Sequence, residues 1–306
     1  MSKNKISVVI NTRNEEQNIE DCLKSVNFAD EIIVVDMEST DDTVKIAKKY
    51  TDKIFSHKMV GYVEPARNFA ISKAIGDWIL IVDADERIGK GLAQKIIDIA
   101  NSKEADFVRI PRKNIIFSQW IRHSRWWPDL NIRFFKKGSV DWQNEIHSIP
   151  VTYGTGINLP QDEELALIHY HYKTIDEFIE RALKYSRQQA KELLDSGYVF
   201  EPSDLITKPF SEFISRFFAG EGYRDGLHGL VLAFLQSFAI LLIYLRLWQE
   251  KNYHPISGPE MMPVWQKSFF DKLQEFNYWF LTVKIQKETS KAKRLLFKVK
   301  RRFMQK

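Results

Sequence analysis

The first hundred residues alternate short apolar runs, rich in β-branched residues, with stretches whose apolar residues recur at helical spacing. The expected strands are 6–10, 31–36, 53–57 and 78–83, and helices are expected within 15–26, 41–50 and 66–75. This order indicates an α/β fold, in which right-handed βαβ units build a mostly parallel sheet with helices on both faces. Ligands of such open sheets bind at the carboxyl ends of the strands.

Polar side chains gather directly after three of these strands, and they are Thr12, Arg13, Asn14, Glu15, Asp36, Ser39, Asp41, Asp83, Asp85 and Glu86. Carboxylates crowded at one strand end repel each other unless a cation shares them. Hard oxygen ligands of this kind suit Mg²⁺ or Mn²⁺ carrying a diphosphate.

Structural interpretations of the same residues remain open. Asp85 and Glu86 could instead cap the helix expected at 91–100. Asp36 and Asp41 could be turn and cap residues, because "STDDT" offers ordinary N-cap chemistry, and Arg67 could be a solvated helix residue.

Three stretches are informative in their order and spacing along the chain: "SVVINTRNEEQNIEDCLKSV", "EIIVVDMESTDDT" and "ARNFAISKAIGDWILIVDADERI". They resemble the nucleotide-sugar-binding half of the inverting family 2 glycosyltransferases with the GT-A fold, closely over residues 5–90. "WWPDLNIRFFKKG", "NEIH", "HYHY" and "GYRDGLHGLVLAF" continue it loosely, and look like the branch with the lipopolysaccharide core β-glucosyltransferases. No G-x-G-x-x-G follows the first strand, which disfavours a dinucleotide-dependent dehydrogenase.

The resemblance implies a role for each matching residue. Binding of the nucleotide sugar falls to Thr12, Arg13, Glu15, Asp36, Ser39, Asp41, Arg67, Asn68, Asp83 and Arg133. Among these Asp36 matches the acid that hydrogen-bonds the base, and Asp83 lies nearer the ribose. Asp85, the second acid of the D-x-D motif, matches the ligand of a Mg²⁺ or Mn²⁺ ion. A leaving diphosphate needs a cation and positive donors of this kind.

The general base that an inverting transfer needs is expected in the second half of the fold. Residues 131–150 are interpreted as a hairpin with a Lys-Lys-Gly-Ser turn. Relatives commonly show histidine followed by glutamate here, but Ser148 follows His147 in this chain. Glu145 is therefore the favoured base, with His147 completing the metal or diphosphate site, and Asp141 is the alternative base.

Two further groups are ambiguous between packing and function. Trp120, Trp126, Trp127, Arg122 and Arg125 are aromatic and guanidinium groups of the kind that hold sugars or phosphates, although tryptophan-rich stretches are more often core. His169 and His171 alternate and are expected to lie on one face of a strand, and packing with local hydrogen bonding is their favoured role.

The chain becomes helical after residue 172. Residues 174–197 are expected to form an amphipathic helix with a Thr174 cap, a capping box completed by Glu177 and a stop at Gly197. Residues 227–245 suit a membrane span, a helix in the membrane interface or a buried core helix. The basic end intersperses apolar residues with cations, which favours an anionic membrane surface.

The charge distribution sets the basic end apart from the rest of the chain. Residues 284–306 hold ten Lys/Arg and only Glu288, so residues 1–283 carry a net charge of −4 although the chain carries +5. Nucleic acid is disfavoured as a partner, because the acidic remainder shows no nucleic-acid-binding motif. The single cysteine, Cys22, excludes an internal disulfide framework and is expected to be buried, and no signal peptide is expected before residue 6.

The resemblance implies a GT-A transferase domain at 1–225, divided into a nucleotide-sugar half (1–110) and an acceptor half (111–225). Residues 226–306 would be membrane-associating helices. The expected activity is inverting, metal-dependent hexose transfer from a nucleotide-diphosphate sugar, with uridine diphosphate as the expected nucleotide. The acceptor would be lipid-linked or a lipopolysaccharide core, at the cytoplasmic face of the bacterial inner membrane. A polyprenyl-phosphate acceptor and a non-catalytic nucleotide-sugar-binding scaffold are the alternatives.

Overall fold

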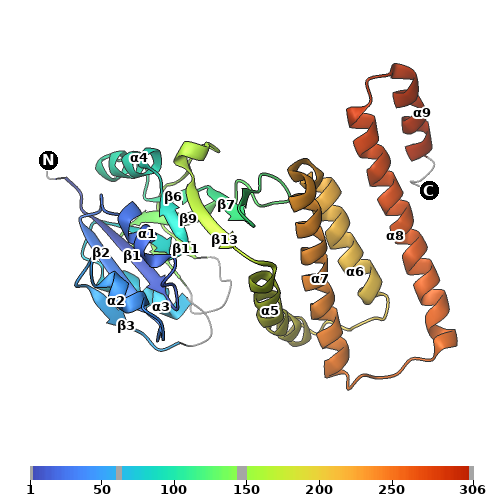
Figure 1. Cartoon of the computed structure of the whole chain (residues 1–306), viewed down its shortest axis with the longest axis horizontal. Helices are drawn as coiled ribbons and strands as arrows, with labels where there is room; N and C mark the ends of the chain where they lie inside the picture. The colour runs from blue at the N-terminus through green and yellow to red at the C-terminus, as the bar shows by residue number, and fades with distance from the viewer. Residues whose placement is uncertain (1–2, 60–63, 143–149, 303–306) are drawn as a thin grey trace. The chain divides into compact units, whose positions relative to one another are not determined.

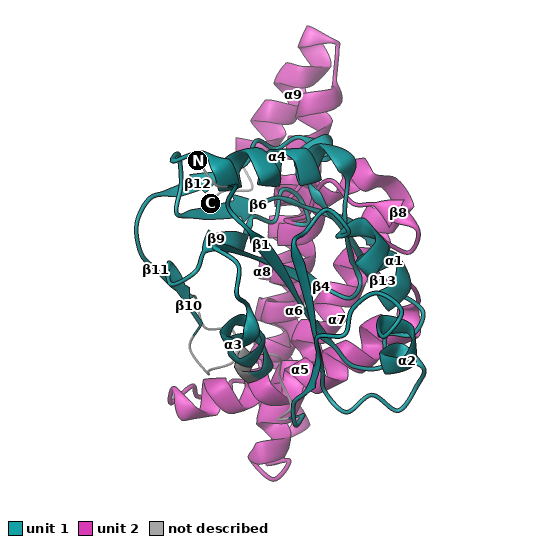
Figure 2. Cartoon of the chain, turned by 90° about the vertical axis from the view of Figure 1, so that its left-hand side faces the viewer, with its two compact units in different colours: residues 1–115, 126–171 teal, residues 116–125, 172–306 magenta. Residues whose placement is uncertain are grey.

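The computed structural model describes residues 3–59, 64–142 and 150–302, which form two compact units. Unit 1 holds residues 1–115 and 126–171, and unit 2 holds residues 116–125 and 172–306 (Figure 2). The predicted boundary between a transferase domain (1–225) and membrane-associating helices (226–306) stays a prediction.

Unit 1 is built around a seven-stranded sheet in the order β12-β6-β9-β4-β1-β2-β3 (Figure 1). Its strands are β1 (Ile6–Thr12), β2 (Glu31–Asp36), β3 (Ile54–Ser56), β4 (Trp78–Asp83), β6 (Phe107–Ile110), β9 (Asn131–Lys136) and β12 (Gly156–Asn158). The strands β1 to β4 pair in parallel, and β9 is antiparallel to both β4 and β6. All four strands expected in the first hundred residues are therefore confirmed.

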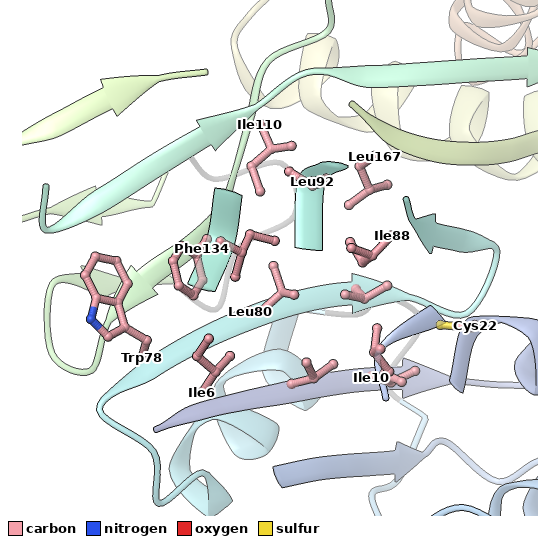
Figure 3. Packing of buried hydrophobic residues seen from close by; sticks show 14 of the residues in the cluster. Ile6, Ile10, Cys22, Trp78, Leu80, Ile88, Leu92, Ile110, Phe134 and Leu167 are labelled. Atoms are coloured by element: carbon pink, nitrogen blue, oxygen red, sulfur yellow. The ribbon is translucent and has the colours of Figure 1, made fainter. Parts of the chain in front are cut away.

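Helices cover both faces of this sheet, as the alternating pattern predicts. They are α1 (Ile19–Ser25), α2 (Thr43–Ala47), α3 (Glu64–Lys73) and α4 (Lys90–Asn101). One core cluster joins the inward residues of β1 and β4 to α1 and α4, and a second joins the opposite face to α3. All seven residues of β1 are buried, because a central parallel strand is covered on both faces. Figure 3 shows the first cluster, in which Trp78 stacks on Phe134 and Cys22 is buried as expected.

A smaller sheet in unit 1 lies beside the carboxyl end of β4. In it β13 (Leu167–Tyr172) pairs antiparallel with β5 (Glu86–Ile88) and neighbours β7 (Arg112–Ile116). The short strands β10 (Val140–Asp141) and β11 (Val151–Thr152) pair with each other. A 3₁₀ turn at Glu163–Leu165 precedes β13.

Unit 2 consists mainly of helices. Its elements are β8 (Gln119–Trp120), α5 (Ile175–Asp195), α6 (Asp204–Ile214), a π-helical turn (Ser215–Ala219), a 3₁₀ turn (Gly222–Asp225), α7 (Gly226–Glu250), α8 (Gly258–Lys287) and α9 (Lys291–Arg302). Thr174 caps α5 as predicted, accepting a hydrogen bond from the Glu177 N–H. The Glu177 carboxylate, however, accepts from the Lys173 N–H rather than from Thr174, so the reciprocal half of the predicted capping box does not form.

The helix that contains α7 is long and apolar enough to cross a membrane. It spans Gly222–Glu250, and in the part of the chain that the structure describes it is the one helix that meets this criterion of length and composition. Little of its most apolar window is buried within the protein. The three possibilities left open for residues 227–245 remain predictions.

Candidate active site

Three neighbouring strands bring their last residues to one edge of the large sheet. Thr12 pairs with Asp36 across β1 and β2, and Asn11 pairs with Asp83 across β1 and β4. Parallel strands present their carboxyl ends together, so the polar residues predicted after these strands share one edge. The common edge is the geometric core of the candidate active site.

Buried polar atoms without a hydrogen-bond partner gather at this edge. They are both polar side-chain atoms of Asn11, the Oγ1 of Thr12 and the Oδ1 of Asp36, and all three residues are buried. Buried polar atoms in folded proteins are nearly always paired, so such a group suits a ligand that supplies the missing donors and acceptors. The other Asp36 oxygen accepts a hydrogen bond from the Ser39 N–H at 3.1 Å, which is the turn role that remained open.

The loops after β1 and β2 are held together by reciprocal hydrogen bonds. The Asn14 N–H donates to Ser39 Oγ at 2.9 Å, and the Thr40 N–H donates back to Asn14 Oδ1 at 2.8 Å. The Glu16 N–H donates to Asp41 at 3.1 Å. Ser39 and Asp41 therefore shape the loop pair, whatever they contribute to a ligand.

Asp41 also holds the start of α2. Its Oδ1 accepts hydrogen bonds from both the N–H and the hydroxyl of Thr43, at 3.0 and 2.5 Å. Burial opposes ionisation, but these hydrogen bonds hold the pKa of Asp41 below its usual value. Arg13, in contrast, is exposed, and the side chain of Glu15 accepts a hydrogen bond from Asn18 at 2.6 Å.

Asp83 is the centre of an arginine and carboxylate network. Arg133 donates to Asp83 and to Glu86, both at 2.7 Å, and Arg67 lies 3.3 Å from the other Asp83 oxygen. Burial opposes its ionisation, yet Arg133 and Arg67 hold the pKa of Asp83 well below its usual range. The Asp83 carboxylate is therefore charged and held in place by two arginines.

Glu86 lies completely inside this network. Its side chain has no exposed surface, and its second oxygen accepts a hydrogen bond from the Asp83 N–H at 2.8 Å. Burial raises the pKa of Glu86, although Arg133 acts in the opposite direction. Because Glu86 belongs to β5 and the N-cap of α4 is Gly89, the idea that Asp85 and Glu86 cap α4 is wrong.

Asp85 faces the two alternating histidines of β13. Its Oδ2 lies 3.5 Å from Nε2 of the buried His169, whose Nδ1 lies 2.6 Å from Asn114 Oδ1. His171 Nδ1 is 3.2 Å from the same His169 Nε2. The prediction that both histidines share one face is confirmed, and their contacts extend to the second acid of the D-x-D motif.

The donor set around Asp85 fits a divalent ion that arrives with a ligand. Within residues 3–59, 64–142 and 150–302, no three His, Cys, Asp or Glu side chains are grouped so as to hold a metal on their own. Magnesium bound with phosphates commonly takes one or two protein carboxylates and fills its other positions with phosphate oxygens and water. Asp85, a partly exposed carboxylate at the strand edge, can supply one such ligand. His147, the other predicted ligand, lies outside the described residues.

Residues on α3 bind the segment that leads toward the predicted base. Asn68 Nδ2 donates to the carbonyl oxygen of Trp142 at 2.6 Å, and the Arg67 guanidinium lies over the Trp142 ring at 5.8 Å. Asp141 is exposed on β10, directly before Trp142. Because β10 pairs with β11, the hairpin expected between residues 131 and 150 does not form as a β9–β10 ladder. Glu145 lies outside the described residues.

Sequence reasoning missed a second layer of polar residues behind the edge. Arg112 Nε donates to Asp129 at 2.8 Å and a further Arg112 nitrogen lies 3.7 Å from Glu86, while Asn114 donates to the Trp126 carbonyl oxygen at 2.6 Å. Arg112 and Asn114 alternate on β7 as His169 and His171 do on β13. This period of two was the only signal that could have indicated a shared polar face.

The tryptophan-rich stretch is divided between the units. Trp126 and Trp127 belong to unit 1, where the Trp126 ring lies 5.6 Å from the ring of His171. Trp120, Arg122 and Arg125 belong to unit 2, where the Arg122 guanidinium stacks 3.8 Å above the Trp120 ring and Arg125 pairs with Glu212.

Comparison with known proteins agrees with this geometry. The family model described as Glycosyl transferase family 2 matches residues 7–157. An uncharacterized glycosyltransferase of Rickettsia typhi is 35% identical over 248 residues, which cover 78% of this chain and 85% of that protein. The lipopolysaccharide core biosynthesis glycosyltransferase LpsC of Rhizobium meliloti is 26% identical over 253 residues, covering 80% and 92%.

Among solved structures, glucosyl-3-phosphoglycerate synthase from Mycobacterium tuberculosis, in complex with Mg²⁺ and uridine diphosphate, has a TM-score of 0.32 at 23% identity. That match covers 36% of this chain and 44% of the synthase. The family match and the identity to the Rickettsia protein together lead to one conclusion: the chain belongs to family 2 of the glycosyltransferases.

Proposed function

We propose that this glycosyltransferase moves one hexose, with inversion, from a nucleotide-diphosphate sugar to a lipid-linked or lipopolysaccharide-core acceptor in bacterial surface glycan synthesis. The observation that carries the donor half is the buried edge at Asn11, Thr12 and Asp36, where both polar side-chain atoms of Asn11, the Oγ1 of Thr12 and the Oδ1 of Asp36 lack hydrogen-bond partners. A carboxylate oxygen there can accept the ring N–H of a pyrimidine base, which supports uridine diphosphate as the nucleotide.

The remaining donor contacts follow from the strand order. Asp83, one strand from Asn11, would accept a hydrogen bond from the ribose, and Arg67 and Arg133 would contribute positive charge beside it. Asp85 would hold Mg²⁺ or Mn²⁺ together with the diphosphate. Such an ion, when bound, stabilises the negative charge that develops on the leaving group.

The general base is proposed to be Glu145, with Asp141 as the alternative. Asn68 and Arg67 fix Trp142 against α3, so the chain that continues to Glu145 starts from an anchored residue. Asp141 is exposed and its strand pairs outside the large sheet, which favours Glu145. His147 is proposed to contact the metal or the diphosphate.

The acceptor and the location are supported by two observations. The LpsC relative is described as a lipopolysaccharide core biosynthesis enzyme, and its similarity extends over most of both chains. The apolar helix Gly222–Glu250 and the basic helix α9 suit attachment to the cytoplasmic face of the inner membrane. Lipopolysaccharide core intermediates are lipid-anchored, so this location would bring enzyme and acceptor together.

A transfer assay tests the proposal. Membranes that hold the full chain would be incubated with labelled nucleotide sugars, Mn²⁺ and a bacterial lipid extract, and one label should enter a lipid-linked or core-oligosaccharide fraction. Label in polyprenyl phosphate alone would establish the alternative acceptor. Binding of uridine diphosphate without any transfer would establish the scaffold alternative.

The donor half has its own matched test. Asp36→Asn should weaken uridine diphosphate binding in calorimetry, because it places an amide where a carboxylate accepts a hydrogen bond. Asp52→Asn, at an exposed position of the same unit, should leave that affinity unchanged. Equal affinity in both variants would remove Asp36 from the nucleotide site.

A further inference from the structure

The helix α8 carries an exposed apolar face that the sequence pattern did not indicate. Met262, Trp265, Phe269, Leu273 and Phe280 are all between 42% and 62% exposed. Their spacing of three, four, four and seven residues places them on one side of the helix. Large exposed apolar patches on soluble proteins are uncommon and mark interaction surfaces.

The contacts that hold α8 within unit 2 leave this face largely exposed. Lys272 of α8 donates to Ser211 of α6 at 2.7 Å, and Ser268, one turn earlier on that side, is buried. The helix α6 contacts both α7 and α8, and Figure 1 shows it lying between them. Ring contacts of Phe276 with Phe218 and of Phe269 with Phe210 also join α8 to the unit, yet the five residues of the apolar face remain between 42% and 62% exposed.

The patch continues from α8 onto α6. Phe210 of α6 is 41% exposed, and its ring lies edge-on to that of Phe269 at 6.4 Å between centroids. Phe270 is also exposed and borders the face. We use the name α8 face for Phe210, Met262, Trp265, Phe269, Phe270, Leu273 and Phe280.

Positive charge lies beside the α8 face. The helix α9 lies along the carboxyl half of α8, where Arg301 donates to Thr282 at 3.2 Å and Lys284 lies 5.8 Å from the Phe297 ring centre. Its twelve residues include seven Lys or Arg and no acid. Leu295, Leu296 and Val299 of α9 are exposed among these cations.

An anionic bilayer matches both properties at once. Aromatic and aliphatic side chains enter the boundary between head groups and acyl chains, while lysine and arginine remain at the anionic head groups. A second copy of this chain matches less well, because it would bring another basic α9 beside the first. We infer that the α8 face, with α9 at its end, is the surface by which unit 2 docks on an anionic lipid bilayer.

This inference rests on the proposed function only in placing the enzyme at a membrane. It differs in the surface that carries attachment: the prediction of membrane-associating helices at 226–306 rested on residues 227–245 and the basic end, whereas the structure adds the exposed face of α8. It also predicts a lipid preference that an apolar span alone would not give.

Vesicle flotation of the full chain tests the inference. Trp265→Ser combined with Phe269→Ser should lower binding to phosphatidylcholine vesicles that contain phosphatidylglycerol by at least about tenfold, since two large aromatic groups no longer leave water. Gln266→Ser combined with Gln274→Ser, at exposed polar positions of the same helix, should leave binding unchanged. The wild-type chain should bind vesicles of phosphatidylcholine alone more weakly.

Two results would overturn the inference. Wild-type flotation by the aromatic variant would show that lipid does not cover the α8 face. A concentration-dependent dimer in sedimentation velocity, lost in the aromatic variant and retained in the glutamine variant, would show that a second copy covers it. Uridine diphosphate binding is measured on the same samples and should be equal in all of them. If the wild-type protein showed no transferase activity, the proposed function would be refuted, and the flotation result would not change.

Discussion

The two units of this glycosyltransferase differ in which kinds of side chain they bury and which they expose. Unit 1 buries charged and polar side chains such as Glu86, Arg133 and His169 and pairs them with one another, while its apolar residues line two closed cores. Unit 2 exposes large apolar residues along α7 and α8, including Leu227, Phe234 and Trp265. Unit 1 therefore suits a polar ligand in water, and unit 2 suits a surface that is partly apolar.

The difference predicts how each unit responds to substitution. Removing one partner from a buried charge network leaves another charge uncompensated, so unit 1 should be sensitive to single substitutions. Exposed residues of unit 2 contact little of the protein, so their substitution should change binding rather than folding.

Arg133→Met should destabilise the protein by about 3–5 kcal/mol, because the fully buried Glu86 and the partly buried Asp83 would lose the cation that they share. Urea unfolding measures the loss. Arg109→Met on β6, whose guanidinium makes one long hydrogen bond to Asn158, is the matched control and should cost less than about 1 kcal/mol. Equal losses in the two variants would show that the network does not stabilise unit 1.

Glu145→Gln should retain donor binding but lose transfer by about two orders of magnitude, as expected when an amide replaces a general base. Asp141→Asn should lose much less, since Asp141 is exposed on β10. Donor affinity and turnover are measured separately. Near-normal turnover in Glu145→Gln with an inactive Asp141→Asn would exchange the two roles, and lost donor affinity in Glu145→Gln would indicate a diphosphate or metal role.

Asp85→Ala should abolish the gain in uridine diphosphate affinity that Mn²⁺ provides. The loss should be at least about tenfold, because removing even a residue that only orients a metal ligand typically costs about that much in metal affinity. The fold should persist, because Asp85 lies beyond the end of β4. Calorimetry with and without Mn²⁺ gives the answer, with Asp98→Ala on the exposed side of α4 as control. A manganese effect that survives in Asp85→Ala would contradict the metal assignment.

Lys298→Gln should weaken binding to anionic vesicles by roughly fivefold, because each lysine near the surface contributes about 1 kcal/mol. The difference from wild type should shrink as salt rises, since the screening length is only about 10 Å at 0.1 M. Lys103→Gln, an exposed lysine of unit 1, should bind vesicles like the wild type. An equal loss in both variants would mean that the net charge of the chain, rather than α9, determines attachment.

The alternation of strands and helices was sufficient to predict the parallel part of the sheet. The first four strands are apolar runs that tertiary packing reinforces, and their carboxyl ends could be found by reading the next polar residue. The positions of Thr12, Asp36 and Asp83 at one edge were therefore predictable. Their roles in binding stay predictions.

The supporting layer was not predictable, because its contacts join distant parts of the chain. Asn114 and His169 are 55 residues apart, and Arg133 and Glu86 are 47 apart. No local pattern specifies that β13 pairs with β5 or that Glu86 becomes fully buried. The α8 face was missed for another reason: its spacing is that of an ordinary amphipathic helix, and only exposure distinguishes it from a core stripe.

The hydrogen-bonded loops after β1 and β2 have a consequence for the rate and the entropy of nucleotide-sugar binding. Asn14, Ser39, Glu16 and Asp41 hold each other through backbone N–H groups before any ligand binds. A nucleotide that enters there need not order the backbone, so little conformational entropy is lost on binding. Donor association should therefore be a single fast phase, with no slow closure of this loop pair after the encounter.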